Sequence, residues 1–157
     1  MQRPTPRHHA LVVCVCLVGA LPTQPSPAAA AEAAVFTSIA GAELRDILRE
    51  EGYSADVNER GVVVWKIDGY RAQLFIDADD GSNMQFHASF SDGNATLKKV
   101  NEWNRTKRYS RTYIDDDGDP HLELDLDLEG GVTRERIIDF LTTCKVSFNT
   151  WCREVVE

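Results

Sequence analysis

Residues 98–131, KKVNEWNRTKRYSRTYIDDDGDPHLELDLDLEGG, decide the fold of this chain. Helical spacing over Ala95–Lys107 precedes a short β-rich run, Ser110–Asp115, and a turn of aspartates and glycine. Leucines then occupy every second position of His121–Leu128, with acidic residues between them. Because side chains of a strand alternate between the two faces of a sheet, this strand has one apolar and one acidic face. The stretch therefore predicts a helix followed by an antiparallel hairpin.

The register of this hairpin depends on which residues form its turn. A two-residue turn at 117–118 would place Arg111 opposite Leu124, whereas a three-residue loop at 116–118 places it opposite Glu123. We predict the three-residue loop, with Gly118 in the left-handed conformation, because a guanidinium buried among leucines without a partner is costly. In this register the outer face carries a candidate protein-binding surface, formed by Arg111, Tyr113, Glu123 and Asp125.

Asn104 falls on the same helical stripe as Leu97 and Val100, where an apolar residue would be expected. A half-buried amide must be hydrogen-bonded, so we expect Asn104 to tie the helix to a neighbouring backbone. The alternative is a polar anchor for a partner. We therefore assign Asn104, like Gly118 at the turn, a structural role.

The aspartate-rich segment Asp115–His121 is a candidate for metal binding or catalysis. With Gly118 at the sixth position of a calcium-binding EF-hand loop, the first and twelfth ligands would be Tyr113 and Leu124, so the spacing does not fit. Paired carboxylates also occur in glycosidases, but these acids lie on one strand with no apolar pocket evident to raise a pKa. We predict no metal, no cofactor and no catalytic residue. A metal-binding protein or hydrolase that uses this segment is the alternative.

The rest of the chain after residue 31, here called the body, predicts two further helices and four strands. Apolar residues at helical spacing between Ile39 and Leu48 predict a first helix that ends at Gly52, and a last helix starts near Thr133. The sequence thus predicts an α+β fold with element order α-ββββ-α-ββ-α, in which an antiparallel sheet, a four-stranded meander plus the hairpin, packs against three helices. The meander strands are Tyr53–Val57, Val62–Ile67, Tyr70–Asp77 and Met84–Phe90.

Histidine and cysteine side chains in the body form no catalytic pattern. His87 lies on the polar side of its strand and is predicted to be a surface histidine rather than a ligand. Eight residues of helix would separate the Cα atoms of Cys144 and Cys152 by about 12 Å, too far for a disulfide. An oxidising compartment would allow a bridge within the chain after a break in the helix, or a bridge between chains. The sequence leaves these states open.

Residues 1–31 have the pattern of a secretory signal peptide. Arg3 and Arg7 precede an apolar run, Ala10–Leu21, and an alanine-rich segment with small residues at the expected cleavage positions. No apolar run reaches the roughly 18 residues that a membrane span needs. We therefore expect a periplasmic or secreted protein that does not span the membrane after cleavage, with residues 35–157 forming a single domain.

The charge of the chain argues against anionic partners such as nucleic acid or an anionic membrane. The chain carries 17 basic and 25 acidic residues, net −8, and only two of the basic residues precede residue 32. A body this acidic is poorly suited to bind nucleic acid or an anionic membrane. Six basic residues at positions 98–111 precede eight acidic residues at positions 112–130. This pattern is either charge compensation between neighbouring elements or a two-signed surface that docks a protein partner.

Several of these motifs, in this order, resemble the YbjN family of bacterial proteins. The resemblance covers roughly Val35 to the end of the chain. It implies a fold similar to that of the type III secretion chaperones, small α+β proteins that bind other polypeptides, and a role in sensory transduction regulation, with no catalytic residues to carry over. The signal peptide distinguishes this chain from cytoplasmic members. The motifs are NEWN at 101–104 with the basic residues after it, Tyr113–Asp115 with Asp117 and Gly118, Leu122–Leu128, Gly130–Thr133, and a first helix ending in Glu50–Tyr53.

These observations together predict a non-enzymatic, exported module that binds a protein or peptide and is chaperone-like or regulatory. The sequence does not identify the partner, and it is compatible with a homodimer. A purely structural protein of the cell envelope is a further option.

Overall fold

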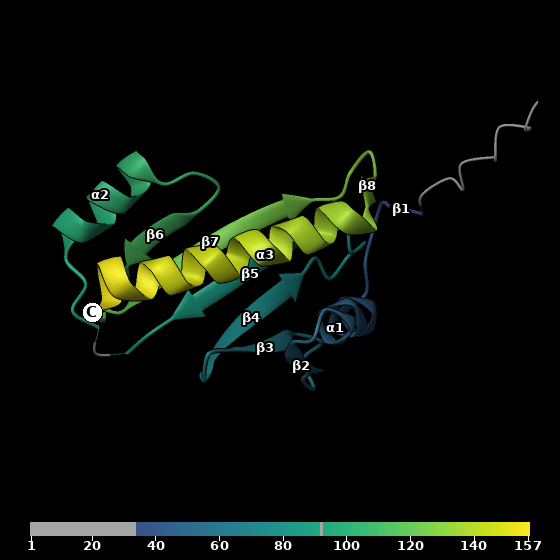
Figure 1. Cartoon of the computed structure of the whole chain (residues 1–157), viewed down its shortest axis with the longest axis horizontal. Helices are drawn as coiled ribbons and strands as arrows, with labels where there is room; N and C mark the ends of the chain where they lie inside the picture. Colours follow the sequence, from purple (N-terminus) through teal and green to yellow (C-terminus); the bar gives the residue numbers. More distant parts are fainter. Residues whose placement is uncertain (1–33, 92) are drawn as a thin grey trace, which may run out of the picture. The chain divides into compact units, whose positions relative to one another are not determined.

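The computed structural model describes residues 34–91 and 93–157, and the predicted signal peptide lies outside these residues. Three α-helices and antiparallel strands confirm the predicted α+β class, with two short strands and a terminal π-helical turn in addition (Figure 1). The elements are β1 (Val35–Phe36), α1 (Gly41–Glu50), β2 (Ser54–Val57), β3 (Val63–Ile67), β4 (Tyr70–Ile76), β5 (Asn83–Ser89), α2 (Leu97–Thr106), β6 (Arg111–Ile114), β7 (Pro120–Asp127), β8 (Val132–Thr133), α3 (Arg134–Trp151) and η1 (Cys152–Val156).

The meander and the hairpin join in one antiparallel sheet of six strands, in the order β2-β3-β4-β5-β7-β6. The junction is between β5 and β7, where Phe86 lies opposite Leu124. Strands β1 and β8 form a separate two-stranded sheet. The tight turn between β3 and β4 has positive φ at both central residues, 49° at Asp68 and 92° at Gly69, as a two-residue hairpin turn requires.

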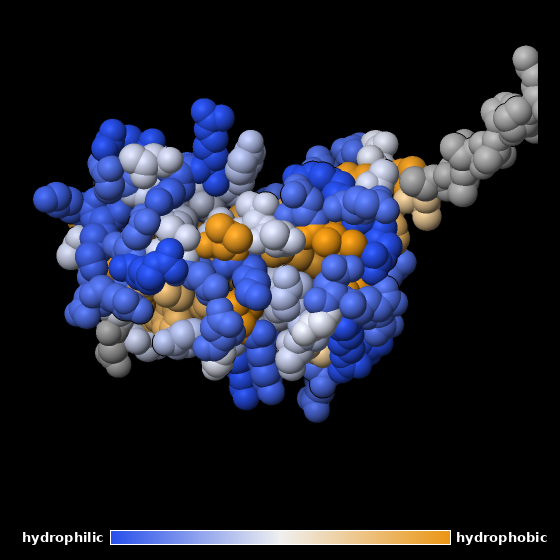
Figure 2. Space-filling view, viewed as in Figure 1, coloured by the Kyte–Doolittle hydropathy of each residue, from blue (hydrophilic) through white to orange (hydrophobic). Residues whose placement is uncertain are grey.

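One face of the six-stranded sheet carries the hydrophobic core. Helix α3 lies along this face over β5 and β7, and α1 lies beside β2 and β3 (Figure 1). Figure 2 shows that the outer surface of this side is mostly hydrophilic, with hydrophobic patches near α3. The core residues on the sheet alternate with outward-facing polar ones, as the period of a strand demands. They include Val63, Trp65, Leu74, Met84, Phe86, Leu122, Leu124 and Leu126.

Helix α3 contains Cys144 and leads directly into η1, which begins at Cys152. The Thr133 hydroxyl caps its start by accepting the Arg136 N–H. No break separates Cys144 from Cys152, and both thiols are free. Burial raises the pKa of Cys144 well above its usual value and that of Cys152 to about 11. None of the helices in the described ranges is long and apolar enough to cross a membrane.

Helix α2 packs differently from the sequence expectation. Leu97 was expected to face the core, but its side chain is 77% exposed, and Trp103 is the buried residue of this helix, at 3% exposure. The Trp103 indole N–H donates to the Ser110 hydroxyl at 3.1 Å. The physical reason is position: α2 lies beside β6 rather than across the sheet, so a narrow contact buries one large side chain instead of a full stripe (Figure 1).

Candidate functional site

The β6–β7 hairpin has the register that the three-residue loop predicts. Arg111 lies opposite Glu123. The Asp115 N–H donates to the Asp119 carbonyl at 3.0 Å and closes the loop, in which Gly118 has a φ of 91°. The predicted left-handed glycine therefore sits where the turn needs it.

Three of the four predicted binding residues form a closed cluster on the outer face. Glu123 was expected in water but is only 6% exposed. Its carboxylate accepts the Arg111 Nε–H at 2.6 Å and the Tyr113 hydroxyl at 3.0 Å. Burial and the hydrogen bond to Glu123 raise the pKa of Tyr113. Two side chains of β6 lie over the carboxylate of Glu123. Strand alternation therefore predicted the correct face of the sheet for Glu123 but not its burial.

A chain of polar contacts continues from this cluster to the aspartate-rich turn. The Tyr113 ring stacks parallel on His121 with centroids 4.7 Å apart. His121 Nδ1 lies 3.0 Å from His87 Nε2, and its Nε2 lies 3.0 Å from Asp115 Oδ2. His87 is half-buried rather than a free surface residue, and desolvation, followed by the neighbouring His121, lowers its pKa.

Asp115 anchors the turn of the aspartate-rich segment. Its carboxylate accepts the backbone N–H groups of Asp117 and Asp119 in addition to facing His121. The hydrogen bond to His121 is the main cause that lowers the pKa of Asp115. Within residues 34–91 and 93–157, no group of three or more His, Cys, Asp or Glu side chains is arranged to hold a metal ion.

At two edges of the sheet, side chains bond to outward-facing backbone groups. On β2, the Arg49 Nε–H donates to the Ala55 carbonyl at 2.9 Å. On β6, the Asn104 amide donates to the Thr112 carbonyl at 2.9 Å, and its oxygen accepts the Thr112 N–H at 3.0 Å. Asn104 is exposed, not half-buried as expected, because it reaches the strand edge from the outside. Both side chains occupy backbone groups that a further strand would use.

A third edge, on β7, is left open. Strand β6 begins at Arg111, opposite Glu123, so Leu124–Asp127 have no paired strand on that side in the described part of the chain. The Leu128 N–H donates to Ser82 of the β5 side at 2.8 Å. Since alternate residues of an antiparallel strand bond to opposite neighbours, Asp125 and Asp127 direct their N–H and C=O groups to the open side.

The chain turns away from this edge at Tyr109. Its φ is 65°, a left-handed conformation that is uncommon for a residue other than glycine. A straight extension of β6 backwards from Arg111 would have covered Leu124–Asp127, whereas the turn diverts the backbone. The Tyr109 side chain is 79% exposed. A strained backbone therefore accompanies the open edge, an association that often marks functional sites.

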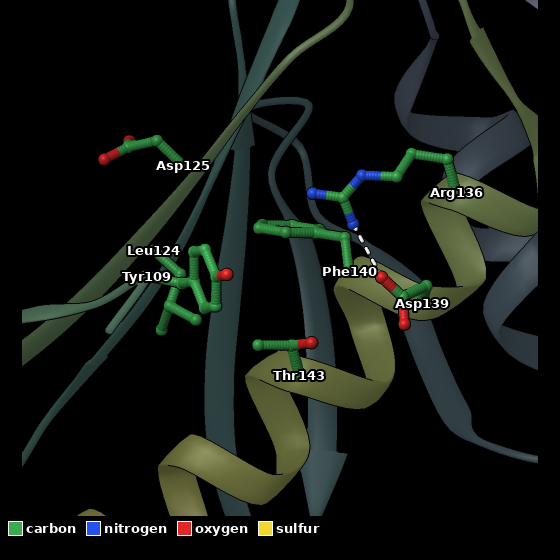
Figure 3. A pocket seen from close by; sticks show the side chains of 7 residues that line it. All are labelled: Tyr109, Leu124, Asp125, Arg136, Asp139, Phe140 and Thr143. Carbon is green, nitrogen blue, oxygen red and sulfur yellow. Dashed lines mark hydrogen bonds and ion pairs between the residues drawn. The ribbon is translucent and has the colours of Figure 1, made fainter. Parts of the chain in front are cut away.

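A cleft of about 470 Å³ lies between the open edge and α3. Figure 3 shows Phe140 between Tyr109 and Leu124 on one side and Arg136 on the other. Arg136 forms an ion pair with Asp139 at 2.9 Å. The side chain of Asp125 points away from the cleft in Figure 3, and it accepts the Gln85 side-chain amide at 2.9 Å. The cleft is lined by Tyr109, Leu124, Asp125, Arg136, Asp139, Phe140 and Thr143.

The sequence prediction located only one member of this site. Asp125 belonged to the predicted surface, whereas Tyr109, Phe140 and Arg136 were not singled out. The spacing of Phe140 indicates a core residue of α3, and Tyr109 precedes a strand without a turn signature. Their meeting depends on how α3 crosses β7, which local sequence patterns do not encode.

Solved structures define the class of this fold as that of YbjN and the type III secretion chaperones. YbjN from E. coli shares 16% identity with a TM-score of 0.59, over 72% of this chain and 87% of that one. The Yersinia pestis chaperone SycH, crystallised in complex with a stable fragment of YscM2, shares 17% identity with a TM-score of 0.50, over 68% of this chain and 94% of that one. At such identities the likeness establishes the fold alone.

The chain belongs to the YbjN family. Residues 41–156 match the family, which is described as "Putative bacterial sensory transduction regulator". The predicted family resemblance is thereby confirmed. No curated protein sequence matches the chain.

Proposed function

We propose that this protein is an exported, non-enzymatic module that binds an extended segment of a partner protein as an added strand on β7. The observation that carries the proposal is the open backbone edge at Leu124–Asp127. An added strand gains main-chain hydrogen bonds whatever its sequence, while an adjacent pocket selects side chains. The cleft beside α3 supplies such a pocket.

The edges of β2 and β6, where side chains bond to the backbone, provide a comparison for the open edge of β7. Proteins generally cover or charge their exposed strand edges, because an open edge invites pairing with other chains. Here Arg49 bonds to the Ala55 carbonyl of β2, and Asn104 bonds to the carbonyl and N–H of Thr112 on β6. In the described part of the chain, the backbone groups of Asp125 and Asp127 have no such side-chain cover. Their carboxylates charge the edge, which disfavours pairing with another acidic strand and leaves the backbone available to a strand of complementary charge.

The outer-face cluster supports the site from one end. Arg111, Tyr113 and Glu123 hold the beginning of β6 against β7 through their mutual hydrogen bonds. This fixes where β6 stops covering β7 and where the open edge begins. Of the four residues proposed to bind a partner, Asp125 contributes directly at the edge, and the other three hold the hairpin next to it.

The family and fold support the type of ligand. SycH, a protein of similar fold, was crystallised with a fragment of another protein, and the YbjN family is described in terms of regulation. Both favour a polypeptide partner over a small substrate. The basic start, apolar run and alanine-rich segment of residues 1–31 support a periplasmic or secreted location.

Site-specific photo-crosslinking in the native host tests the proposal. A photoreactive residue replaces Asp127 at the edge or, as the control, Asp79 in the exposed turn between β4 and β5. We expect a partner adduct from position 127 and not from position 79. Asp125→Pro removes one edge N–H and should abolish the adduct, whereas Asp125→Asn keeps that N–H and should retain it.

The fold of each variant is checked by its melting temperature. An adduct that forms equally from both positions, or one that persists in a folded Asp125→Pro variant, would contradict strand addition. The absence of any adduct from position 127 in the native host would contradict it as well.

A further inference from the structure

We infer that the segment added to β7 alternates apolar and basic residues, an inference that rests on the strand addition proposed above. Residues directly opposite each other on neighbouring strands share a face of the sheet. The chemistry of each face along Leu124–Asp127 therefore specifies the side chains of the incoming strand. The two faces differ sharply here.

The inner face calls for apolar residues. Positions opposite Leu124 and Leu126 direct their side chains toward the core side of the sheet, where the cleft lies. Phe140 is buried in the cleft, and the exposed Tyr109 ring forms one wall. The charged groups of the opposite wall, Arg136 and Asp139, already neutralise each other. Apolar side chains at alternate positions would fill this space and cover the Tyr109 ring.

The outer face calls for basic residues. Asp125 and Asp127 are exposed, and their neighbours on β5 are the neutral amides Gln85 and Asn83. Neither carboxylate has a basic partner within salt-bridge distance among the described residues. Glu123, two residues before Asp125 on the same face of β7, pairs across the strands with Arg111. An added strand continues the line of β6, so basic residues opposite the two aspartates would extend this pattern at the same spacing.

A second copy of this edge is a poor occupant. To keep leucines on the core face, self-pairing must place odd-numbered residues of one copy opposite odd-numbered residues of the other. Asp125 would then face Asp125 or Asp127 of the second chain. Like charges directly opposite each other destabilise a strand pair, so the edge favours a different, basic strand.

Binding of short labelled peptides to the exported protein tests this inference. Three seven-residue peptides with blocked ends alternate valine with lysine, with threonine or with glutamate, and a fourth contains the valine–lysine composition with its lysines consecutive. Fluorescence anisotropy gives each dissociation constant. We expect the alternating lysine peptide to bind about fivefold or more tightly than the threonine peptide, and the glutamate peptide most weakly.

Protein variants connect the preference to the edge. Asp125→Asn and Asp127→Asn should each weaken the lysine peptide by about two- to fivefold, whereas Glu59→Gln, at an exposed acid in the turn between β2 and β3 on the other side of the sheet, should not. Equal binding of the consecutive-lysine peptide would show general charge attraction and overturn the inference. If the threonine or glutamate peptide binds the edge as tightly as the lysine peptide, the basic preference is wrong while strand addition stands. If no alternating peptide binds, the basic preference is wrong and strand addition also loses its support.

Discussion

The Asn104 side chain hydrogen-bonds to the backbone of Thr112 as a neighbouring strand would. Its amide donates to the Thr112 carbonyl at 2.9 Å, and its oxygen accepts the Thr112 N–H at 3.0 Å. Helix α2 thereby covers the outer edge of β6 at Thr112 with a single amide. Strand β7 extends beyond β6, and within the residues that the structure describes nothing covers its backbone in this way at Leu124–Asp127. The contrast between these two edges underlies the proposed function.

Replacement of Asn104 by leucine tests this closure. Asn104→Leu keeps a similar volume but leaves the Thr112 N–H and C=O without their partner, so the free energy of unfolding should fall by about 1–3 kcal/mol. Asn101→Leu makes the same change at another exposed position of α2 and should alter stability by less than about 0.5 kcal/mol. Urea denaturation measures both. Equal stability of the two variants would show that the amide contributes nothing to the edge.

Removal of the buried carboxylate tests the outer-face cluster. Glu123→Ala leaves the Tyr113 hydroxyl and the Arg111 guanidinium without their shared acceptor and should lower the free energy of unfolding by about 1–3 kcal/mol. Asp125→Ala, on the same strand but exposed, should cost less than about 1 kcal/mol. A larger loss for Asp125→Ala than for Glu123→Ala in denaturant titrations would mean that the cluster does not hold the hairpin.

His87 makes stability depend on pH. Its pKa is lowered from 6.5 in the folded protein, so the unfolded chain takes up the proton more readily. Its contribution to stability is therefore fully present above about pH 6.5 and declines as the pH falls below this value. His87→Gln should flatten the pH dependence of the melting temperature between about pH 5 and 7 relative to the wild type. An unchanged slope in the variant would rule out His87 as the cause.

The cysteines should react slowly in the native state. Cys144 is buried, and the pKa of Cys152 is raised to about 11, so little thiolate exists at pH 8. Titration with a thiol-specific disulfide reagent should label both thiols quickly in denaturant and slowly without it. The intact mass of the exported protein, from which cleavage of the predicted signal peptide removes Cys14 and Cys16, should show two free thiols. A mass two units lower, or a dimer that reductant dissociates, would instead indicate a bridge.

Much of the hairpin follows from local patterns, and the limits of those patterns have physical causes. The alternation of His121–Leu128 and the need to keep Arg111 off the leucine face gave the correct register. Helical spacing alone put Leu97 toward the core, because it cannot tell whether a helix lies over a sheet or beside it. The burial of Glu123 depends on how Arg111 and Tyr113 fold over it.

The open edge and its cleft lay beyond sequence reasoning for a related reason. The edge exists because β6 is shorter than β7 on one side, and strand ends are poorly specified by composition. Its cleft joins Tyr109 before β6 to Phe140 on α3, residues that meet only once α3 has packed across β7. Asp125 was identified because it shares a strand with Glu123.

Residue-resolved amide hydrogen exchange along β7 tests the central claim most directly. In the free protein, the N–H groups of Leu124 and Leu126 bond to β5, whereas those of Asp125 and Asp127 face the open side. After correction for intrinsic rates, we expect the two aspartate amides to exchange at least about tenfold faster than the two leucine amides. A bound strand, such as the alternating lysine peptide, should slow the aspartate amides specifically. Equal protection of all four amides in the free protein, or binding that leaves the aspartate amides fast, would contradict the account.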